Sequence, residues 1–350
     1  MSAVTYLEAI SQAIREEMRR DEAVFLLGED VGTYGGAFKV STGFLEEFGP
    51  DRVIDTPMAE AAIIGSAVGA ALMGMRPIAE MQFIDFITCG FDQIINMANK
   101  MYWRVGMPVP IVIRGPSGGG TKGGPFHSSS PEAWFFHAPG IKVVVPSTTY
   151  DAKGLLKAAV RDNNPVLYLE HKLLYRLPEL REELPEEDYV VPLGKAITRR
   201  EGEDMTILTY GAMVHQSLKA ARVLEEENDL EVEVIDLRSL TPLDREAILE
   251  SVKRTNKVLI VHEDTLTGGI GAELAAILAE DLFEYLDGPI TRVAAPDVAF
   301  PYAPPLKEAF LPNADKILDA ARRLAAYKIE GAGETETKHV IQRGYTCQRQ

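Results

Sequence analysis

Short apolar runs alternate along this chain with longer segments whose apolar residues recur at helical spacing. In the first half of the chain, the short runs predict strands at residues 24–27, 53–55, 77–82, 110–114, 142–146 and 166–170. The longer segments predict helices at residues 61–75, 86–105 and 150–162. Strands that alternate with helices form mostly parallel sheets covered by helices on both faces. We therefore predict an α/β fold for this half of the chain.

A proline-rich stretch at residues 177–193 interrupts the alternation, because Pro178, Pro185 and Pro192 discourage regular structure. Strands are predicted again at residues 205–210, 231–237, 258–262 and 290–293. Helices are predicted at residues 212–227, 244–255, 271–283 and 314–327. The predicted organisation is an α/β domain at residues 1–176, a linker at 177–193, a smaller α/β domain at 194–330, and a flexible tail or partner-wrapping arm at 331–350.

Composition narrows the class of protein. The 350 residues include 46% hydrophobic and 25% charged residues, as in ordinary globular proteins. The net charge of −16 and the lack of a basic cluster argue against nucleic acid and other polyanions as partners. Cys89 and Cys347 are too few for a disulfide framework, and residues 1–20 lack the pattern of a targeting peptide. No long uncharged apolar run indicates a membrane span, so we expect a bacterial cytoplasmic protein.

Three motifs are set aside. Residues 118–124 are rich in glycine, but they lack the Gly-Lys-Ser/Thr order of a phosphate loop. Residues 268–271 follow a predicted strand without the glycine spacing of a dinucleotide fingerprint, so they predict a tight turn at a helix start. His127 and His137 have no third ligand at a recognisable spacing, which argues against zinc.

The candidate chemistry lies between residues 55 and 127. Glu60 stands at the start of a predicted helix, where the helix dipole alone could favour a carboxylate. The segment 82–86 supplies Phe83 and Phe86, either of which could simply be core. His127 follows Gly118-Gly119-Gly120 in a loop rich in glycine and serine, which would expose an imidazole.

Together, an acid, a stacking ring and a histidine suit a flat heteroaromatic cofactor. The sequence contains no motif suited to hold a diphosphate and its metal. The chain therefore carries one half of a predicted cofactor site, and a partner subunit is expected to carry the other half.

The order of these motifs resembles the beta subunit of thiamine-diphosphate-dependent 2-oxo acid dehydrogenases over residues 1–327. The segments that carry the resemblance are residues 28–32, 55–60, 82–86, 118–120, 127–128, 150–154, 161–165, 169–171, 193–196 and 210–212. The resemblance implies a transketolase-like architecture. It has an N-terminal pyrimidine-binding domain and a C-terminal domain that helps to build dimer contacts and to dock an acyltransferase core.

The resemblance also implies roles for individual residues. Glu60 would face the aminopyrimidine of thiamine diphosphate and promote its imino tautomer, and Phe86 would stack on that ring. Gln82 and Met58 would be further cofactor contacts. His127 would steer the keto oxygen of the substrate or hand over a proton during lipoyl acylation. Magnesium and the diphosphate would be held by a Gly-Asp-Gly motif on the alpha subunit, and this chain has no Gly-Asp-Gly.

A potassium ion is the second metal that the resemblance implies. Some members bind it near the segments that match Ile111, Ala159, Asp162 and Asn164. Carbonyl and carboxylate oxygens suit such a hard cation.

The predicted function is oxidative decarboxylation of a 2-oxo acid with transfer of the acyl group to a lipoyl arm, within an α2β2 heterotetramer. The alternatives are an acetoin dehydrogenase beta subunit and a non-catalytic subunit that scaffolds a complex. The sequence does not distinguish pyruvate, branched-chain 2-oxo acids and acetoin, because part of the pocket belongs to the other subunit.

Overall fold

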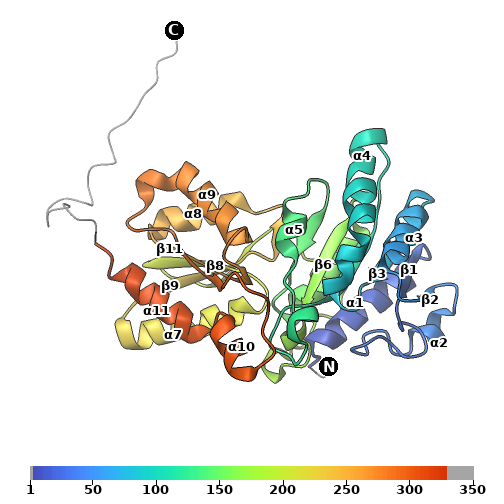
Figure 1. Cartoon of the computed structure of the whole chain (residues 1–350), viewed down its shortest axis with the longest axis horizontal. Helices are drawn as coiled ribbons and strands as arrows, with labels where there is room; N and C mark the ends of the chain where they lie inside the picture. The colour runs from blue at the N-terminus through green and yellow to red at the C-terminus, as the bar shows by residue number, and fades with distance from the viewer. Residues whose placement is uncertain (1–2, 329–350) are drawn as a thin grey trace, which may run out of the picture.

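The first of two sheets in the computed structural model, which describes residues 3–328, has seven strands in the order β10-β5-β6-β4-β3-β1-β2 (Figure 1). Neighbours from β2 to β5 pair in parallel, and β10 pairs with β5 in the antiparallel sense. The strands are β1 (Val24–Gly28), β2 (Val53–Asp55), β3 (Arg76–Glu80), β4 (Val112–Ser117), β5 (Lys142–Val144), β6 (Val166–His171) and β10 (Ser239–Thr241). The predicted parallel sheet is confirmed.

Helices cover both faces of this sheet. They are α1 (Tyr6–Arg20), α2 (Phe44–Phe48), α3 (Glu60–Leu72), α4 (Asn99–Val105), α5 (Glu132–Phe136) and α6 (Thr149–Arg161). Alternate side chains of β1 enter different hydrophobic clusters, because successive residues of a strand face opposite ways. Val24 and Leu26 pack in the cluster that contains α1 and α6, whereas Phe25 and Leu27 pack in the cluster that contains α3.

The second sheet has the order β12-β11-β8-β9-β7, and only its edge strand β7 is antiparallel to its neighbour. The strands are β7 (Ile197–Arg200), β8 (Met205–Thr209), β9 (Val232–Asp236), β11 (Val258–Thr265) and β12 (Thr291–Ala295). In Figure 1, α8 (Arg245–Thr255) and α9 (Ile270–Leu282) lie above this sheet, and α7 (Met213–Asn228) and α11 (Ala314–Ala325) lie below it. The short helix α10 (Pro304–Phe310) lies beside the first domain.

The segment predicted as a helix at residues 86–105 is helical throughout, but it is not a single α-helix. The chain instead forms a 3-10 helix at Ile84–Gly90, a π-helical segment at Gln93–Ala98 and then α4. Gly90 approaches α3 so closely that a Cβ atom there would lie 2.9 Å from the Ile64 side chain. Packing against α3 therefore shapes this segment, and apolar periodicity alone does not reveal such a constraint.

Six elements are absent from the predictions made on periodicity, namely α1, α2, α5, α10, β7 and β10. Helix α1 is stabilised at its start by a capping box, in which Thr5 and Glu8 bond each other's backbone amides. The 3-10 helices are Gly124–Phe126, Lys172–Leu174, Pro178–Leu180 and Phe283–Tyr285, in addition to Ile84–Gly90.

In the predicted linker, regular structure within residues 177–193 is confined to the turn Pro178–Leu180 and a bridge between Val4 and Glu182. The boundaries at residues 176 and 194 stay a prediction. The predicted tail at residues 331–350 lies outside the described residues.

A buried ionic network joins helix α6 of the first domain to the second sheet. The Arg199 guanidinium of β7 pairs with Asp151 of α6 and with Asp236 of β9, and Arg238 also pairs with Asp151. Both carboxylates are fully buried. Burial raises the pKa of Asp236, although the Arg199 charge opposes that rise.

Replacing Arg199 by methionine is expected to lower the free energy of unfolding by about 3–5 kcal/mol, because two buried carboxylates lose their shared cation. Arg245, whose side chain is 53% exposed and pairs with Asp281, is the matched control. Arg245→Met is expected to cost at most about 1 kcal/mol. Urea unfolding of both variants measures the difference, and equal small losses would show that the network contributes little.

Candidate active site

The candidate site lies at the carboxyl ends of the parallel strands, where ligands bind in open α/β sheets. Gly28 at the end of β1 is in register with Asp55 at the end of β2 and with Glu80 at the end of β3. Ser117 at the end of β4 is in register with His171 of β6. The loops that leave these strands carry most of the residues predicted for the site.

Glu60 is the first residue of α3 and is partly exposed. Glu29, which follows β1, lies close enough to Glu60 for the two charges to interact. Glu29 is buried, and its Oε1 atom has no hydrogen-bond partner among the described residues. Burial raises the pKa of Glu29, and the negative charges of Glu60 and Asp30 raise it further. The structure thus pairs Glu60 with a second carboxyl group that holds its proton more tightly than usual.

Aromatic rings surround His127. The centre of the His127 ring lies 4.7 Å from the centre of the Phe83 ring and 5.6 Å from that of the Phe86 ring. Both contacts are edge-to-face. Phe38 also packs edge-to-face against Phe83, with the ring centres 5.5 Å apart. The structure therefore brings together the predicted histidine and both predicted phenylalanines, with the imidazole still partly exposed.

Asp85 fixes the backbone next to His127. Its Oδ1 atom accepts hydrogen bonds from the amide nitrogens of Ser128 at 3.0 Å and Ser129 at 2.8 Å. A carboxylate that accepts two backbone N–H groups holds a loop in one conformation. Residues 82–86 were predicted only to supply aromatic rings, and this role of Asp85 was not predicted, although an acid between two phenylalanines was a visible signal.

Several buried polar atoms near this cluster have no partner among residues 3–328. They are Gln82 Oε1, Asp85 Oδ2, Ser128 Oγ and Lys172 Nζ. Burial lowers the pKa of Lys172 to about 8, although Asp85 and Glu263 oppose that change. Buried polar groups are normally hydrogen-bonded. Their concentration around Phe83 and His127 suits a site that takes up a polar, flat ligand.

Met58 is placed differently from the other predicted contacts. Its side chain is 84% exposed and stands two residues before Glu60. A cofactor contact by Met58 therefore requires that the cofactor or a partner cover this surface.

The residues predicted for potassium already have partners. The Ile111 carbonyl accepts from the Val166 amide, and the Ala159 carbonyl accepts from the Asp162 amide. The Asp162 carboxylate accepts from the Lys142 ammonium and from the Asn164 amide. Burial opposes the change, but these donors lower the pKa of Asp162. A lysine ammonium thus lies at the carboxylate where the ion was predicted, and the potassium site stays a prediction.

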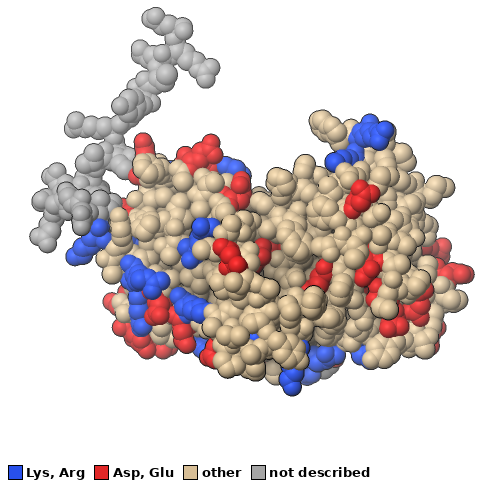
Figure 2. Space-filling model, viewed as in Figure 1, with Lys and Arg blue, Asp and Glu red and all other residues tan. Residues whose placement is uncertain are grey.

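Within residues 3–328, no three His, Cys, Asp or Glu side chains are grouped to hold a metal ion. None of the helices in that range has both the length and the apolar character needed to cross a bilayer. On the face shown in Figure 2, Lys and Arg are scattered among Asp and Glu and form no continuous basic surface.

The chain is similar in sequence to known families and proteins. Residues 2–178 match the model of the transketolase pyrimidine binding domain, and residues 194–317 match that of the transketolase C-terminal domain. The chain is 53% identical over 330 residues to the 2-oxoisovalerate dehydrogenase subunit beta of Bacillus subtilis, with 93% of this chain and 100% of the relative covered. It is 45% identical over 329 residues to the pyruvate dehydrogenase E1 component subunit beta of the same organism, with the same shares covered.

Among solved structures, a split gene transketolase, described as an inactive beta4 tetramer, aligns with a TM-score of 0.76 at 24% identity. The alignment covers 93% of this chain and 100% of that one. The predicted two-domain, transketolase-like α/β fold is confirmed.

Proposed function

Because this chain belongs to the family of beta subunits of 2-oxo acid dehydrogenases, we propose that it supplies the pyrimidine-binding half of a thiamine diphosphate site. The enzyme would decarboxylate a 2-oxo acid oxidatively and transfer the acyl group to a lipoyl arm. The observation that carries the proposal is the grouping of Glu60 and Glu29 near the carboxyl ends of β1 and β2, with His127 held between Phe83 and Phe86.

When bound, thiamine diphosphate supplies a carbon nucleophile and an electron sink for decarboxylation. Glu60 would hydrogen-bond a ring nitrogen of the pyrimidine and hold or release a proton there. Glu29 supports this role, because a neighbouring carboxyl group with a raised pKa can share a proton with Glu60.

Phe86 would lie against the pyrimidine, and Gln82 would offer its unpartnered Oε1 atom to the amino group. Met58 would cover the outer side of the ring. His127 would orient the keto oxygen of the substrate or donate a proton during lipoyl acylation, because its ring is partly exposed while its backbone is fixed by Asp85.

The remaining half of the site would come from an alpha subunit in an α2β2 heterotetramer. That subunit would hold the diphosphate and magnesium. The lipoyl arm would come from the acyltransferase core of a multienzyme complex, and we place the assembly in the bacterial cytoplasm. Potassium at Ile111, Ala159, Asp162 and Asn164 would require Lys142 to move away from Asp162.

A branched-chain 2-oxo acid is the substrate to test first. The identity to the relative named for 2-oxoisovalerate is 53%, against 45% to the relative named for pyruvate. Pyruvate and acetoin are the competing substrates, and a scaffolding subunit without catalytic residues is the competing role.

Reconstitution tests the proposal. The purified chain alone is expected to bind thiamine diphosphate weakly and to show no decarboxylation. Addition of the cognate alpha subunit with magnesium is expected to restore both activities in an α2β2 particle, measured with 2-oxoisovalerate, pyruvate and acetoin in parallel. Turnover by this chain alone would contradict the half-site, and a reconstituted particle inactive on all three would support the scaffolding role.

A further inference from the structure

The loop formed by residues 118–129 carries His127 and has few hydrogen bonds between its own residues. Five of its residues are glycine, and its only regular element is the short turn Gly124–Phe126. The loop closes through a hydrogen bond from the Gly118 amide to the Ser129 carbonyl at 2.9 Å. A glycine-rich segment loses much conformational entropy when it is ordered. The position of His127 therefore depends on contacts that the loop makes with other parts of the chain.

One anchor from the second domain is Glu263 on β11. Its Oε1 atom accepts a hydrogen bond from the Gly119 amide, and its Oε2 atom lies 2.7 Å from Nε2 of His171. Glu263 is 7% exposed, so its charge acts in a buried setting. Burial opposes the change, but His171 and the Gly119 amide lower the pKa of Glu263. The carboxylate therefore stays ionised and bonds the start of the loop.

A second anchor comes from α10, where Lys307 Nζ donates a hydrogen bond to the Thr121 carbonyl at 2.7 Å. The preceding segment presses on the same loop, since a Cβ atom at Gly119 would lie 2.2 Å from the Phe300 ring. A Cβ atom at Gly124 would likewise lie 2.7 Å from the Tyr302 ring. Residues 300–307 of the second domain thus cover the glycine-rich part of the loop.

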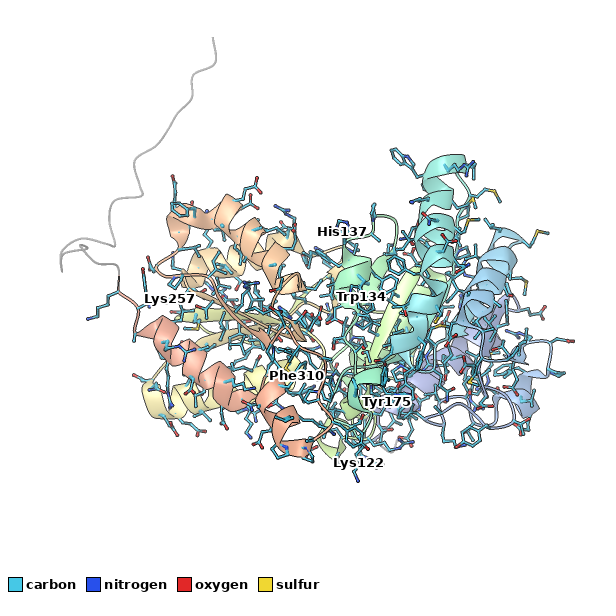
Figure 3. The ribbon with its side chains drawn as sticks, in the orientation of Figure 1. Lys122, Trp134, His137, Tyr175, Lys257 and Phe310 are labelled. Carbon is cyan, nitrogen blue, oxygen red and sulfur yellow. The ribbon has the colours of Figure 1, made fainter. Side chains whose placement is uncertain are left out.

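The space beneath the loop would let it move if these anchors were lost. A cavity of about 290 Å³ lies at the junction of the two domains and is lined by residues that include Ser128, Trp134, Glu263 and Phe310. In Figure 3, Trp134 and Phe310 lie at this junction, and Lys122 of the loop points to the surface below them. Lys257 lies on the far side of the second domain.

We propose that Glu263 and Lys307 are positioning residues, through which the second domain holds the His127 loop in place. The second domain would then set the rate of the step that His127 serves, in addition to any part in assembly. The contacts themselves are independent of the reaction. Only the kinetic consequence rests on the proposed function.

Hydrogen exchange of the full chain tests the structural part. In Lys307→Ala, the amides of residues 118–129 are expected to exchange about tenfold faster. Loss of roughly one charge-assisted hydrogen bond raises the population of the open loop by about that factor. Lys257→Ala is the matched control, because Lys257 Nζ also bonds a single backbone carbonyl, that of Ala325 at 3.1 Å. It is expected to leave exchange in the loop unchanged, and Lys307→Arg is expected to restore protection.

Trypsin gives a second readout, since Lys122 is an exposed cleavage site inside the loop. Cleavage there should accelerate in Lys307→Ala and in Glu263→Gln, but not in Lys257→Ala. Unchanged loop exchange in Lys307→Ala, or equal acceleration in Lys257→Ala, would overturn the proposal. Lys307 is partly exposed, whereas Glu263 is buried, so the Lys307 variant decides the question even if Glu263→Gln fails to fold.

The kinetic part is measured in the reconstituted heterotetramer. Lys307→Ala is expected to lower kcat for lipoyl acylation about tenfold while the Kd for thiamine diphosphate stays within about twofold, which corresponds to roughly one lost positioning contact. An unchanged kcat with a mobile loop would overturn the claim that the second domain sets this rate. If the wild-type particle has no activity, the proposed function fails, and the exchange data still decide whether the loop is held by the second domain.

Discussion

Replacing Glu60 by glutamine is expected to slow hydrogen-deuterium exchange at the thiazolium carbon of bound thiamine diphosphate by at least about a hundredfold, the lower end of general acid-base effects. Glutamine has nearly the same shape and can still accept a hydrogen bond, but it cannot hold and release a proton at a comparable acidity. The variant chain is expected to fold, to assemble with the alpha subunit and to bind the cofactor. The loss should therefore lie in the activation step itself.

The competing explanation is that Glu60 only stabilises the start of α3. A carboxylate in the first turn of a helix contributes about 0.3–1 kcal/mol through the helix dipole. Glu273, an exposed acid in the first turn of α9, provides the matched control. Both substitutions to glutamine should cost similar stability, but only Glu60→Gln should slow the exchange. An unchanged exchange rate in a folded, cofactor-loaded Glu60→Gln particle would remove Glu60 from the catalytic residues.

The order of strands and helices could be predicted wherever local sequence decides structure. Strand β2 (Val53–Asp55) was predicted with its observed bounds, and α3 begins one residue before the predicted start. Such segments carry their own periodicity and turn signals, so contacts with distant parts of the chain alter their structure little. The position of Glu60 at the start of α3 was also predicted, because an acid before an apolar helical run is a local pattern.

Elements whose stability comes from distant contacts were missed. Strand β10 has only three residues and exists because it pairs with β5, almost one hundred positions earlier in the chain. The segment 84–105 has helical periodicity, yet its close approach to α3 at Gly90 divides it into three kinds of helix. Neither effect leaves a mark in a short window of sequence.

The same distinction separates the site residues. Glu60, Phe86 and His127 lie in motifs whose composition is unusual by itself. Glu263 could not be predicted as a contact of the His127 loop, because Gly119 is 144 positions away from it along the chain. Only the packing of the second domain against the first brings the two together.

Replacing His127 by alanine is expected to lower the rate of decarboxylation or of lipoyl acylation about 10²- to 10⁴-fold, the usual contribution of a positioned acid or base. Cofactor affinity should change little, because His127 is expected to contact the substrate, whereas Glu60, Gln82 and Phe86 are the residues expected to contact the pyrimidine. The two steps are measured separately in the reconstituted heterotetramer, with an artificial electron acceptor for decarboxylation and a lipoyl domain for acylation. The step that slows more identifies the one in which the imidazole acts.

His137 is the matched control, because it is an exposed histidine ten positions further along the chain (Figure 3). His137→Ala should leave both rates unchanged. The structural alternative is that His127 only fills the space between two phenylalanine rings. In that case, His127→Phe would preserve the packing and both rates, whereas a proton-transferring imidazole cannot be replaced by a hydrocarbon ring. Normal rates in His127→Phe would therefore assign the histidine to packing, and a loss equal to that of His127→Ala would assign it to the chemistry.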